Sequence, residues 1–244
     1  PLIGITAIND WEKNTGKATW KAGKISWEPK RVYISPTDTF GYTYGQFKKM
    51  GWGLQKPVSG YYCTVWLKNK KGKWKIFFSQ GLFQLKIKGD PNRPVFNEVK
   101  ASQLTGLQKT LLDADVFFPK YAKQYGISAA FHQFIADDGI AVGDSGPAAT
   151  KETYRQLMIT EKKQSAQVSR TLAWRPVFSY LDSSAVIGFN TGPYTMTVVE
   201  QNGRKRKLHG NFFSIWKREK GEWRFVYDGG NRVSDKKAQA VDYK

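Results

Sequence analysis

The stretch that decides the fold runs from residue 215 to residue 228 and reads IWKREKGEWRFVYD. Two runs rich in aromatic and β-branched residues flank Lys220-Gly221, a pair typical of a tight hairpin turn. Alternation along the first run places Phe212, Ser214 and Trp216 on one face. The pattern therefore predicts two antiparallel strands, over residues 211–219 and 222–228.

The hairpin and the strands before it occur twice in the chain. The landmarks of the first occurrence are Trp27, Pro29, Gly41, Gly45, Gly60, Trp66, Gly72 and Trp74. They return, at offsets of 147 to 150 residues, as Trp174, Pro176, Gly188, Gly192, Gly210, Trp216, Gly221 and Trp223. This spacing is too long for a solenoid unit. We predict two related domains in tandem, over residues 1–83 and 104–244, with a linker over 84–103 that is rich in turn-forming residues.

The two occurrences differ in what precedes them. Before Trp174, helical spacing of apolar residues predicts helices over 108–125, 128–136 and 150–163, with a short strand at 140–142. Pro119 predicts a kink or a break in the first helix. Only 26 residues precede Trp27, and residues 10–13 are the candidate remnant of a helix. Either the first domain has lost its helices, or the chain begins inside a domain.

The strands complete an α+β prediction, in which long, curved antiparallel strands wrap three helices. We expect strands over 24–34, 39–50, 61–69 and 73–79, then over 171–181 and 185–199. Gly188 and Gly192 predict sharp bends. A first sheet without helices would expose apolar side chains, for which Ile25, Trp27, Val65 and Phe77 are candidates.

Composition narrows the function classes. Apolar residues make up 40% of the chain, and no apolar run is long enough to span a bilayer. One Cys, at position 63, and two His give no metal-ligand spacing, so we expect no metal and no cofactor. Pro1 in place of Met is consistent with removal of a leading segment, and if that segment was a signal peptide, the protein is periplasmic or extracellular.

The net charge of +19 would attract polyanions or an anionic surface. Much of the charge lies in expected turns, at residues 68–73 and 204–207, where solvated Lys and Arg accumulate. No nucleic-acid recognition motif accompanies it. We therefore predict that nucleic acid is not the partner.

Several motifs together resemble one family. Trp174-Arg175-Pro176, the run 188–192 and the stretch 215–228 resemble the SnoaL-like branch of the nuclear transport factor 2 superfamily, as do residues 113–115 and 130–138. The resemblance covers nearly all of residues 107–230, and residues 20–80 resemble only the strand half. It implies a cone-shaped α+β barrel around a pocket. The superfamily includes isomerases, hydrolases, dehydratases, cyclases and non-catalytic domains, so fold alone assigns no activity.

Ketosteroid-isomerase chemistry within this superfamily needs a carboxylate base and a hydrogen-bond donor. The resemblance places the base at Gly143 or Asp144 and the donor at Phe213, which cannot donate. The sequence departs from the pattern at both positions. We therefore predict no catalytic residues of this type.

The leading hypothesis is that the C-terminal cone binds a small, partly apolar molecule. The residues expected to line the pocket are His132, Tyr154, Trp174, Tyr194, Trp216 and Asp228. Strand alternation would put Trp174, Phe178 and Tyr180 on one face. One alternative is a hydrolase or isomerase that uses His132 or Asp228. Another is a scaffold that self-associates through its sheets, as a homo-oligomer or by pairing of its own domains.

Overall fold

The computed structural model describes residues 23–51, 56–81, 106–143, 148–164 and 168–233. The chain divides into two units, Pro1–Phe96 and Asn97–Lys244, which we describe separately. The expected helix remnant at residues 10–13, the linker 84–103 and Asp144 lie outside the described residues. The domain limits at 83 and 104 stay a prediction.

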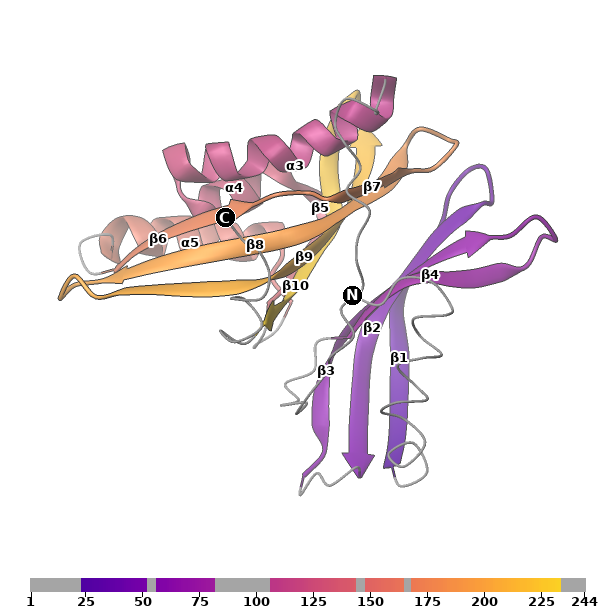
Figure 1. Cartoon of the computed structure of the whole chain (residues 1–244), viewed down its shortest axis with the longest axis horizontal. Helices are drawn as coiled ribbons and strands as arrows, with labels where there is room; N and C mark the ends of the chain where they lie inside the picture. Colours follow the sequence, from indigo (N-terminus) through magenta and orange to yellow (C-terminus); the bar gives the residue numbers. More distant parts are fainter. Residues whose placement is uncertain (1–22, 52–55, 82–105, 144–147, 165–167, 234–244) are drawn as a thin grey trace. The chain divides into compact units, whose positions relative to one another are not determined.

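The first unit contains a four-stranded antiparallel meander (Figure 1). Its strands are β1 (Gly23–Ile34), β2 (Phe40–Gly51), β3 (Val58–Lys68) and β4 (Trp74–Gly81), in that spatial order. The turn before β4 is built by Asn69, whose Oδ1 accepts hydrogen bonds from the backbone N–H groups of Lys71 and Lys73. Gly72 supplies the positive φ of 71° that this turn needs.

The second unit has helices on one face of a curved sheet (Figure 1). Its described helices are α3 (Gly106–Tyr125), α4 (Ile127–Phe134) and α5 (Lys151–Gln164). Its strands are β5 (Ile135–Val142), β6 (Val168–Trp174), β7 (Phe178–Leu181), β8 (Ile187–Glu200), β9 (Lys205–Glu219) and β10 (Glu222–Val233). The sheet order is β5-β10-β9-β8-β6, and β7 pairs with β8. The α+β prediction is confirmed.

The sheet departs from a purely antiparallel meander at β5. We expected helix to continue to residue 136, but Ile135 already pairs with Phe225, and β5 runs parallel to β10. Ile135 is fully buried, so the sheet offers it both hydrogen bonds and burial. The close approach is possible because Gly139 has no side chain: a Cβ there would lie 2.7 Å from the Phe225 carbonyl oxygen.

Helix α3 continues through Pro119, so of the predicted kink or break the break does not occur. Proline in a helix interior costs about 3 kcal/mol, because it removes one hydrogen bond and crowds the preceding turn. Asp115, Phe118 and Ala122, on either side of Pro119, are all buried. Tertiary packing along this face outweighs the local preference.

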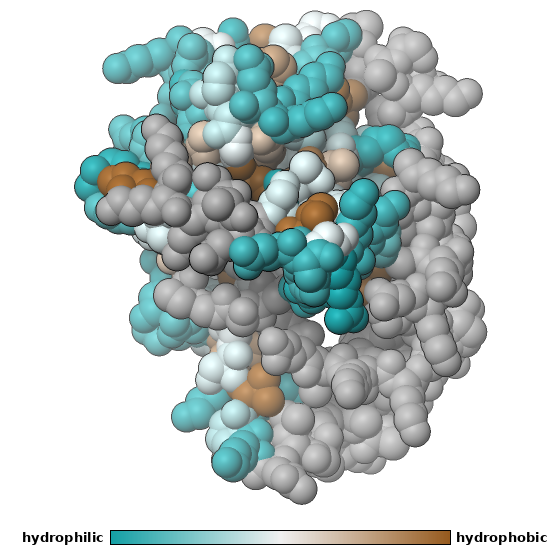
Figure 2. Space-filling view, turned by 90° about the vertical axis from the view of Figure 1, so that its left-hand side faces the viewer, coloured by the Kyte–Doolittle hydropathy of each residue, from teal (hydrophilic) through white to brown (hydrophobic). Residues whose placement is uncertain are grey.

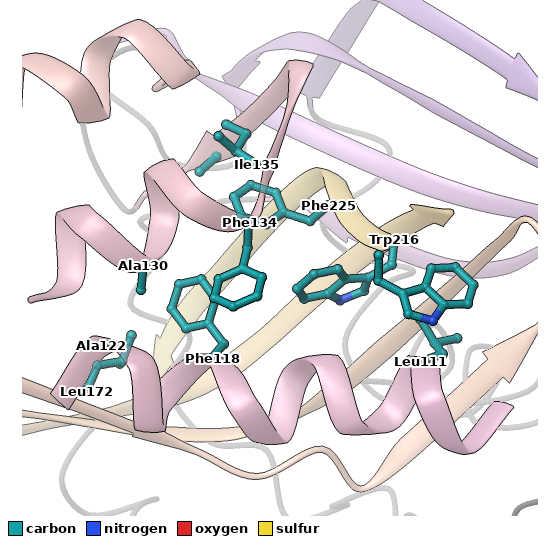
Figure 3. Close-up of a cluster of buried hydrophobic side chains, with 11 residues drawn as sticks. Leu111, Phe118, Ala122, Ala130, Phe134, Ile135, Leu172, Trp216 and Phe225 are labelled. Atoms are coloured by element: carbon teal, nitrogen blue, oxygen red, sulfur yellow. The ribbon is translucent and has the colours of Figure 1, made fainter. Parts of the chain in front are cut away.

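The core of the second unit lies between α3, α4 and the sheet (Figure 3). The ring of Phe134 lies 5.5 Å from that of Phe118 and 6.3 Å from that of Trp216, and Trp216 lies 5.8 Å from Phe225. The two contacts of Trp216 are edge-to-face, an arrangement that suits the charge distribution of aromatic rings. The face of the sheet that carries Trp216 is therefore the face that the helices cover.

One face assignment from the sequence is wrong. Trp174 stacks on Phe212, on the helix side of the sheet. Phe178 and Tyr180 instead pack against Phe189, on the opposite side. The alternation fails because residues 175–177 lie between β6 and β7 rather than in a continuous strand.

The two sheets pair their central strands in the same register. Gly41 lies opposite Trp66 in the first sheet, as Gly188 lies opposite Trp216 in the second. Each sheet then has one extra residue on the strand that follows this tryptophan. On β4 it lies between Ile76 and Phe78, the partners of Trp66 and Val65. On β10 it lies between Phe225 and Tyr227, the partners of Trp216 and Ile215. The same strand register and the same extra residue therefore occur together in both sheets.

A close backbone approach recurs as well. A Cβ on Gly45 would lie 1.9 Å from the carbonyl oxygen of Glu28, and a Cβ on Gly192 would lie 1.9 Å from that of Arg175. Both positions therefore require glycine.

The described surface has both hydrophilic and hydrophobic residues. Figure 2 shows one side of the molecule, where the described surface is mostly hydrophilic and hydrophobic residues form separate patches. In the first unit, Trp27 and Phe77 are exposed, as expected, but Val65 is fully buried because it lies on the face opposite to Trp66. Among the described helices, none is long and apolar enough to cross a membrane.

Candidate functional site

The second unit contains a cavity of about 350 Å³ between its helices and its sheet. Its aromatic walls come from five elements: Phe131, Tyr154, Trp174, Tyr194 and Phe212. Leu172, Met196 and Leu208 add aliphatic surface. The charged residues of the lining are Asp228 and Arg232, both on β10. The cavity is therefore largely apolar, with its charges confined to one strand.

Contacts with neighbouring rings and one hydrogen bond fix the orientation of the aromatic walls. The ring of Trp174 is stacked between Phe118, at 4.4 Å, and Phe212, at 4.8 Å. Its Nε1 donates a hydrogen bond of 2.7 Å to the carbonyl oxygen of Asp115. On the helix side, Phe131 stacks on Tyr154 at 4.7 Å with nearly parallel planes. These rings form a preformed apolar surface.

The ring of Tyr194 lies across two glycines of the neighbouring strands. A Cβ on Gly210 would lie 2.3 Å from Tyr194 Cε1, and one on Gly230 would lie 3.4 Å from the same atom. Glycine at both positions therefore leaves room for a ring beside Asp228 and Arg232. This explains the glycine at position 230, two residues after Asp228 in the lining.

Asp228 is the acidic group of the cavity, and it is only 8% exposed. It lies on β10 opposite Ser214, whose Oγ donates a 2.6 Å hydrogen bond to its Oδ2. Burial raises the pKa of Asp228 to about 7, although the Ser214 hydrogen bond opposes the shift. Near neutral pH this carboxyl can either donate or accept a proton.

Tyr154 adds a second polar group to the lining. Burial, and to a smaller extent the charge of Asp228, raise the pKa of Tyr154. Its hydroxyl therefore keeps its proton and can serve as a donor to a bound molecule.

A second buried carboxyl, Asp115 on α3, lies behind the cavity wall. Its Oδ2 accepts hydrogen bonds from Asn190 Nδ2, at 2.6 Å, and from Trp216 Nε1, at 2.8 Å. Burial raises the pKa of Asp115 well above its usual range, and Asp228 contributes in the same direction. Sequence analysis did not single out Asp115 as functional. The available signal was a carboxyl on the apolar stripe of a helix.

The structure brings together four of the six predicted pocket residues, Tyr154, Trp174, Tyr194 and Asp228. His132 is not part of the lining. Its neighbour Phe131 faces the cavity, and successive residues of a helix are rotated by about 100°. His132 lies instead near Glu152, whose pKa is lowered to about 2 mainly by Arg155 and Gln156, with a small contribution from His132.

Trp216 is also outside the lining, because it is fully buried in the core (Figure 3). It shares a face with Phe212 but lies four residues further along β9, which corresponds to about 14 Å along a strand. Sequence alternation predicted its face and could not predict its depth in the cone.

The positions implied by ketosteroid-isomerase chemistry remain without suitable groups in the described residues. Gly143 lines the cavity but has no side chain. Phe213 lies on the other face of the sheet, where it contacts Phe189 and Tyr227. Since the described lining has one carboxylate and neither His nor Cys, it also offers fewer ligands than a typical metal site uses.

No protein-family model matches the sequence, and no curated protein matches it. Among solved structures, the chain is similar to a ketosteroid isomerase-like protein from Erwinia carotovora atroseptica, with 16% identity and a TM-score of 0.42 over 51% of this chain and 95% of that one. It is similar to a nuclear transport factor 2-like superfamily protein from Salmonella enterica, with 12% identity and a TM-score of 0.43 over 53% and 92%.

A structure from Catenulispora acidiphila in complex with S-DNPA is also similar, with 10% identity and a TM-score of 0.40 over 54% of this chain and 95% of that one. At such identities and TM-scores the likeness assigns neither a family nor an activity. The second unit has helices on one face of a curved sheet around a cavity, and the solved structures to which the chain is similar include ones described as ketosteroid isomerase-like and nuclear transport factor 2-like.

Proposed function

We propose that the second unit binds a small, partly apolar molecule in the cavity between its helices and its sheet. The observation that supports this most directly is an aromatic-lined space of about 350 Å³ whose described lining includes one carboxyl, that of Asp228. Small-molecule sites typically span about 300–1,000 Å³ and combine apolar walls with a few polar groups. Trp174 and Phe212 would contact the apolar body of the ligand, and Asp228 and Tyr154 would orient its polar group.

Filling the cavity tests the proposal. We expect Met196→Trp to weaken the binding of neutral aromatic fragments, such as 2-naphthol, by about tenfold or more, because the indole would occupy their space. Ile159→Trp, on the exposed side of α5, is the matched control. Ligand-observed NMR reports binding. If no fragment of a panel binds the native protein better than Met196→Trp, the proposal fails.

A second candidate function is proton transfer by Asp228, as in an isomerase or hydrolase. The observation that favours it is a pKa of about 7 at a carboxyl that lines the cavity, since general acid–base groups work best near the ambient pH. The ionised carboxylate would take a proton from a carbon next to a ligand carbonyl. The neutral acid would return it.

Hydrogen–deuterium exchange of 2-tetralone in D₂O separates the two functions. If Asp228 transfers protons, the native protein accelerates exchange next to the carbonyl, the rate rises through about pH 7, and Asp228→Asn abolishes the acceleration. Asp228→Asn should still bind 2-naphthol, because Asn keeps the shape and can bond to Ser214. Exchange no faster than in buffer leaves the binding function alone.

We further infer that the first sheet is the strand half of the same fold, repeated in tandem. The common register, bulge and close glycine approach support this relationship. An experimental structure in which the strands of the two units do not superpose, with Trp66 on Trp216, would refute it. The described residues of the first unit, 23–51 and 56–81, form strands without a helix and so build no cavity of the second type, which favours an interaction role for this sheet.

A further inference from the structure

The first sheet has a face that corresponds to the helix-covered face of the second. Trp216 lies on the covered face and packs against Phe134 of α4. Trp66 occupies the same register position, opposite a glycine of the preceding strand. We call the face of the first sheet that carries Trp66 the Trp66 face.

One end of the Trp66 face is apolar and exposed to solvent, whereas Phe47, farther along the same face, is buried. Val32, Ile34 and Ile76 have exposed fractions of 64%, 50% and 53%. Ile34, Gly41, Trp66 and Ile76 follow one another across the four strands in a single row. Val32 belongs to the same face, because it pairs with Thr43, whose Oγ1 accepts a hydrogen bond from Trp66 Nε1. The exposed side chains are therefore contiguous.

Trp74 extends this apolar surface at the end of the sheet. Its ring lies 3.7 Å from the position that a Cβ of Gly41 would take, so it covers that glycine on the Trp66 face. The Nζ of Lys68 lies 5.1 Å above the Trp74 ring, and it also pairs with Asp38. An apolar patch with a cation at its rim is typical of a protein-binding surface.

Charge favours an acidic partner. Between residues 23 and 81 the chain has 11 Lys and Arg but only two acidic residues, Glu28 and Asp38. A second copy of this basic sheet would be repelled. Residues 1–22, with three Lys against Asp10 and Glu12, also lack complementary charge. Both observations favour a different protein as the partner that binds this face.

The second unit indicates which element fits this face. There, α3 covers the corresponding surface with an apolar stripe that includes Leu111 and Phe118. Val32, Ile34 and Ile76 offer apolar contact and no side-chain hydrogen bonds, which suits a helix stripe better than nucleotide bases. We propose that the Trp66 face binds an acidic amphipathic helix of a partner protein.

A designed peptide tests this with the full-length chain. The probe is a fluorescein-labelled helix of about 18 residues, with Leu at i, i+3, i+4 and i+7 positions and Glu on its other face. Fluorescence anisotropy should show saturable binding that weakens as salt is raised. The same peptide with Lys in place of Glu, and a scrambled Leu/Glu peptide, should bind at least about tenfold more weakly. Equal binding of all three peptides would overturn the proposal.

Variants locate the site. Val32→Glu and Ile76→Glu should each weaken binding of the acidic peptide about tenfold or more, because each places a carboxylate in the apolar contact. Leu157→Glu, which changes a 40% exposed residue of α5, is the matched control and should leave binding unchanged. Circular dichroism and thermal unfolding confirm that each variant is folded. If one is not, Ile34→Ser replaces it.

Other occupants give distinct results, and each would overturn the proposal. If the native protein is a dimer by light scattering and Val32→Glu makes it monomeric, a second copy covers the face. If the peptide binds only after residues 1–22 are deleted, this chain covers its own face. If single-stranded DNA binds and Val32→Glu and Ile76→Glu abolish that binding while the peptide does not bind, the face recognises nucleic acid.

Discussion

At the scale of single residues, the second unit buries two carboxyl groups on the helix side of its sheet, Asp115 and Asp228. They differ in whether they are accessible from the cavity. Asp228 lines the cavity and accepts one side-chain hydrogen bond, from Ser214, whereas Asp115 lies in the core and accepts two. Asp228 is therefore placed to meet a ligand, and Asp115 is placed to hold α3, β8 and β9 together.

The pKa of Asp228 predicts how stability depends on pH. Its folded value of about 7 lies above the unfolded value of about 4. The folded state therefore holds the proton more strongly, and this stabilisation is complete below about pH 4 and lost as the pH rises through about 7. The full effect is of the order of 4 kcal/mol. Asp115 shifts in the same direction.

We therefore expect the melting temperature to fall between about pH 5 and pH 8, and to fall less in Asp228→Asn, which stays neutral throughout. Thermal unfolding followed by circular dichroism measures both curves. The informative quantity is the difference between the variant and the native protein, because other titrating groups cancel in it. A difference that does not grow with pH would contradict the assignment.

Replacing Asp115 tests its structural role. Asp115→Ala leaves Trp216 Nε1 and Asn190 Nδ2 buried without their acceptor, and we expect a loss of about 3 kcal/mol in the free energy of unfolding. Asp115→Asn keeps an acceptor oxygen and should cost less. Asp113→Ala, on the exposed side of the same helix, is the control. Urea unfolding would contradict this role if the two alanine variants were equally stable.

At the scale of elements, the glycines of β2 and β8 control how closely their partner strands approach. A Cβ at Gly192 would lie 1.9 Å from the Arg175 carbonyl oxygen, far inside contact distance. We expect Gly192→Ala to destabilise the second unit by about 2 kcal/mol or more, because the backbone must separate. Gly45→Ala should do the same to the first sheet. Thr197→Ala, also on β8, is the control in urea unfolding, and equal stability of all three would refute the close approach.

The helices and strands also differ in how far the sequence alone could predict them. Periodicity and turn residues located most of the described strands and helices, because these signals are local. The continuation of α3 through Pro119 and the pairing of Ile135 with Phe225 depend on contacts between segments far apart in the chain. The site residues divide in the same way, into those that local patterns predict and those that depend on long-range packing. Strand alternation found Trp174 and Tyr194, whereas the rotation of His132 out of the lining and the burial of Trp216 required the packed structure.

At the scale of the whole molecule, the net charge of +19 predicts a weak and unselective attraction to polyanions. The basic clusters at residues 68–73 and 204–207 include strand ends and turns, where they can neutralise phosphates without reading bases. We expect short DNA duplexes to bind at about 50 mM salt and to dissociate by about 200 mM. Anisotropy titrations with duplexes of different sequence should give the same affinity. A preference greater than about tenfold for one sequence, or binding that persists at the higher salt, would mean that the charge forms a specific site.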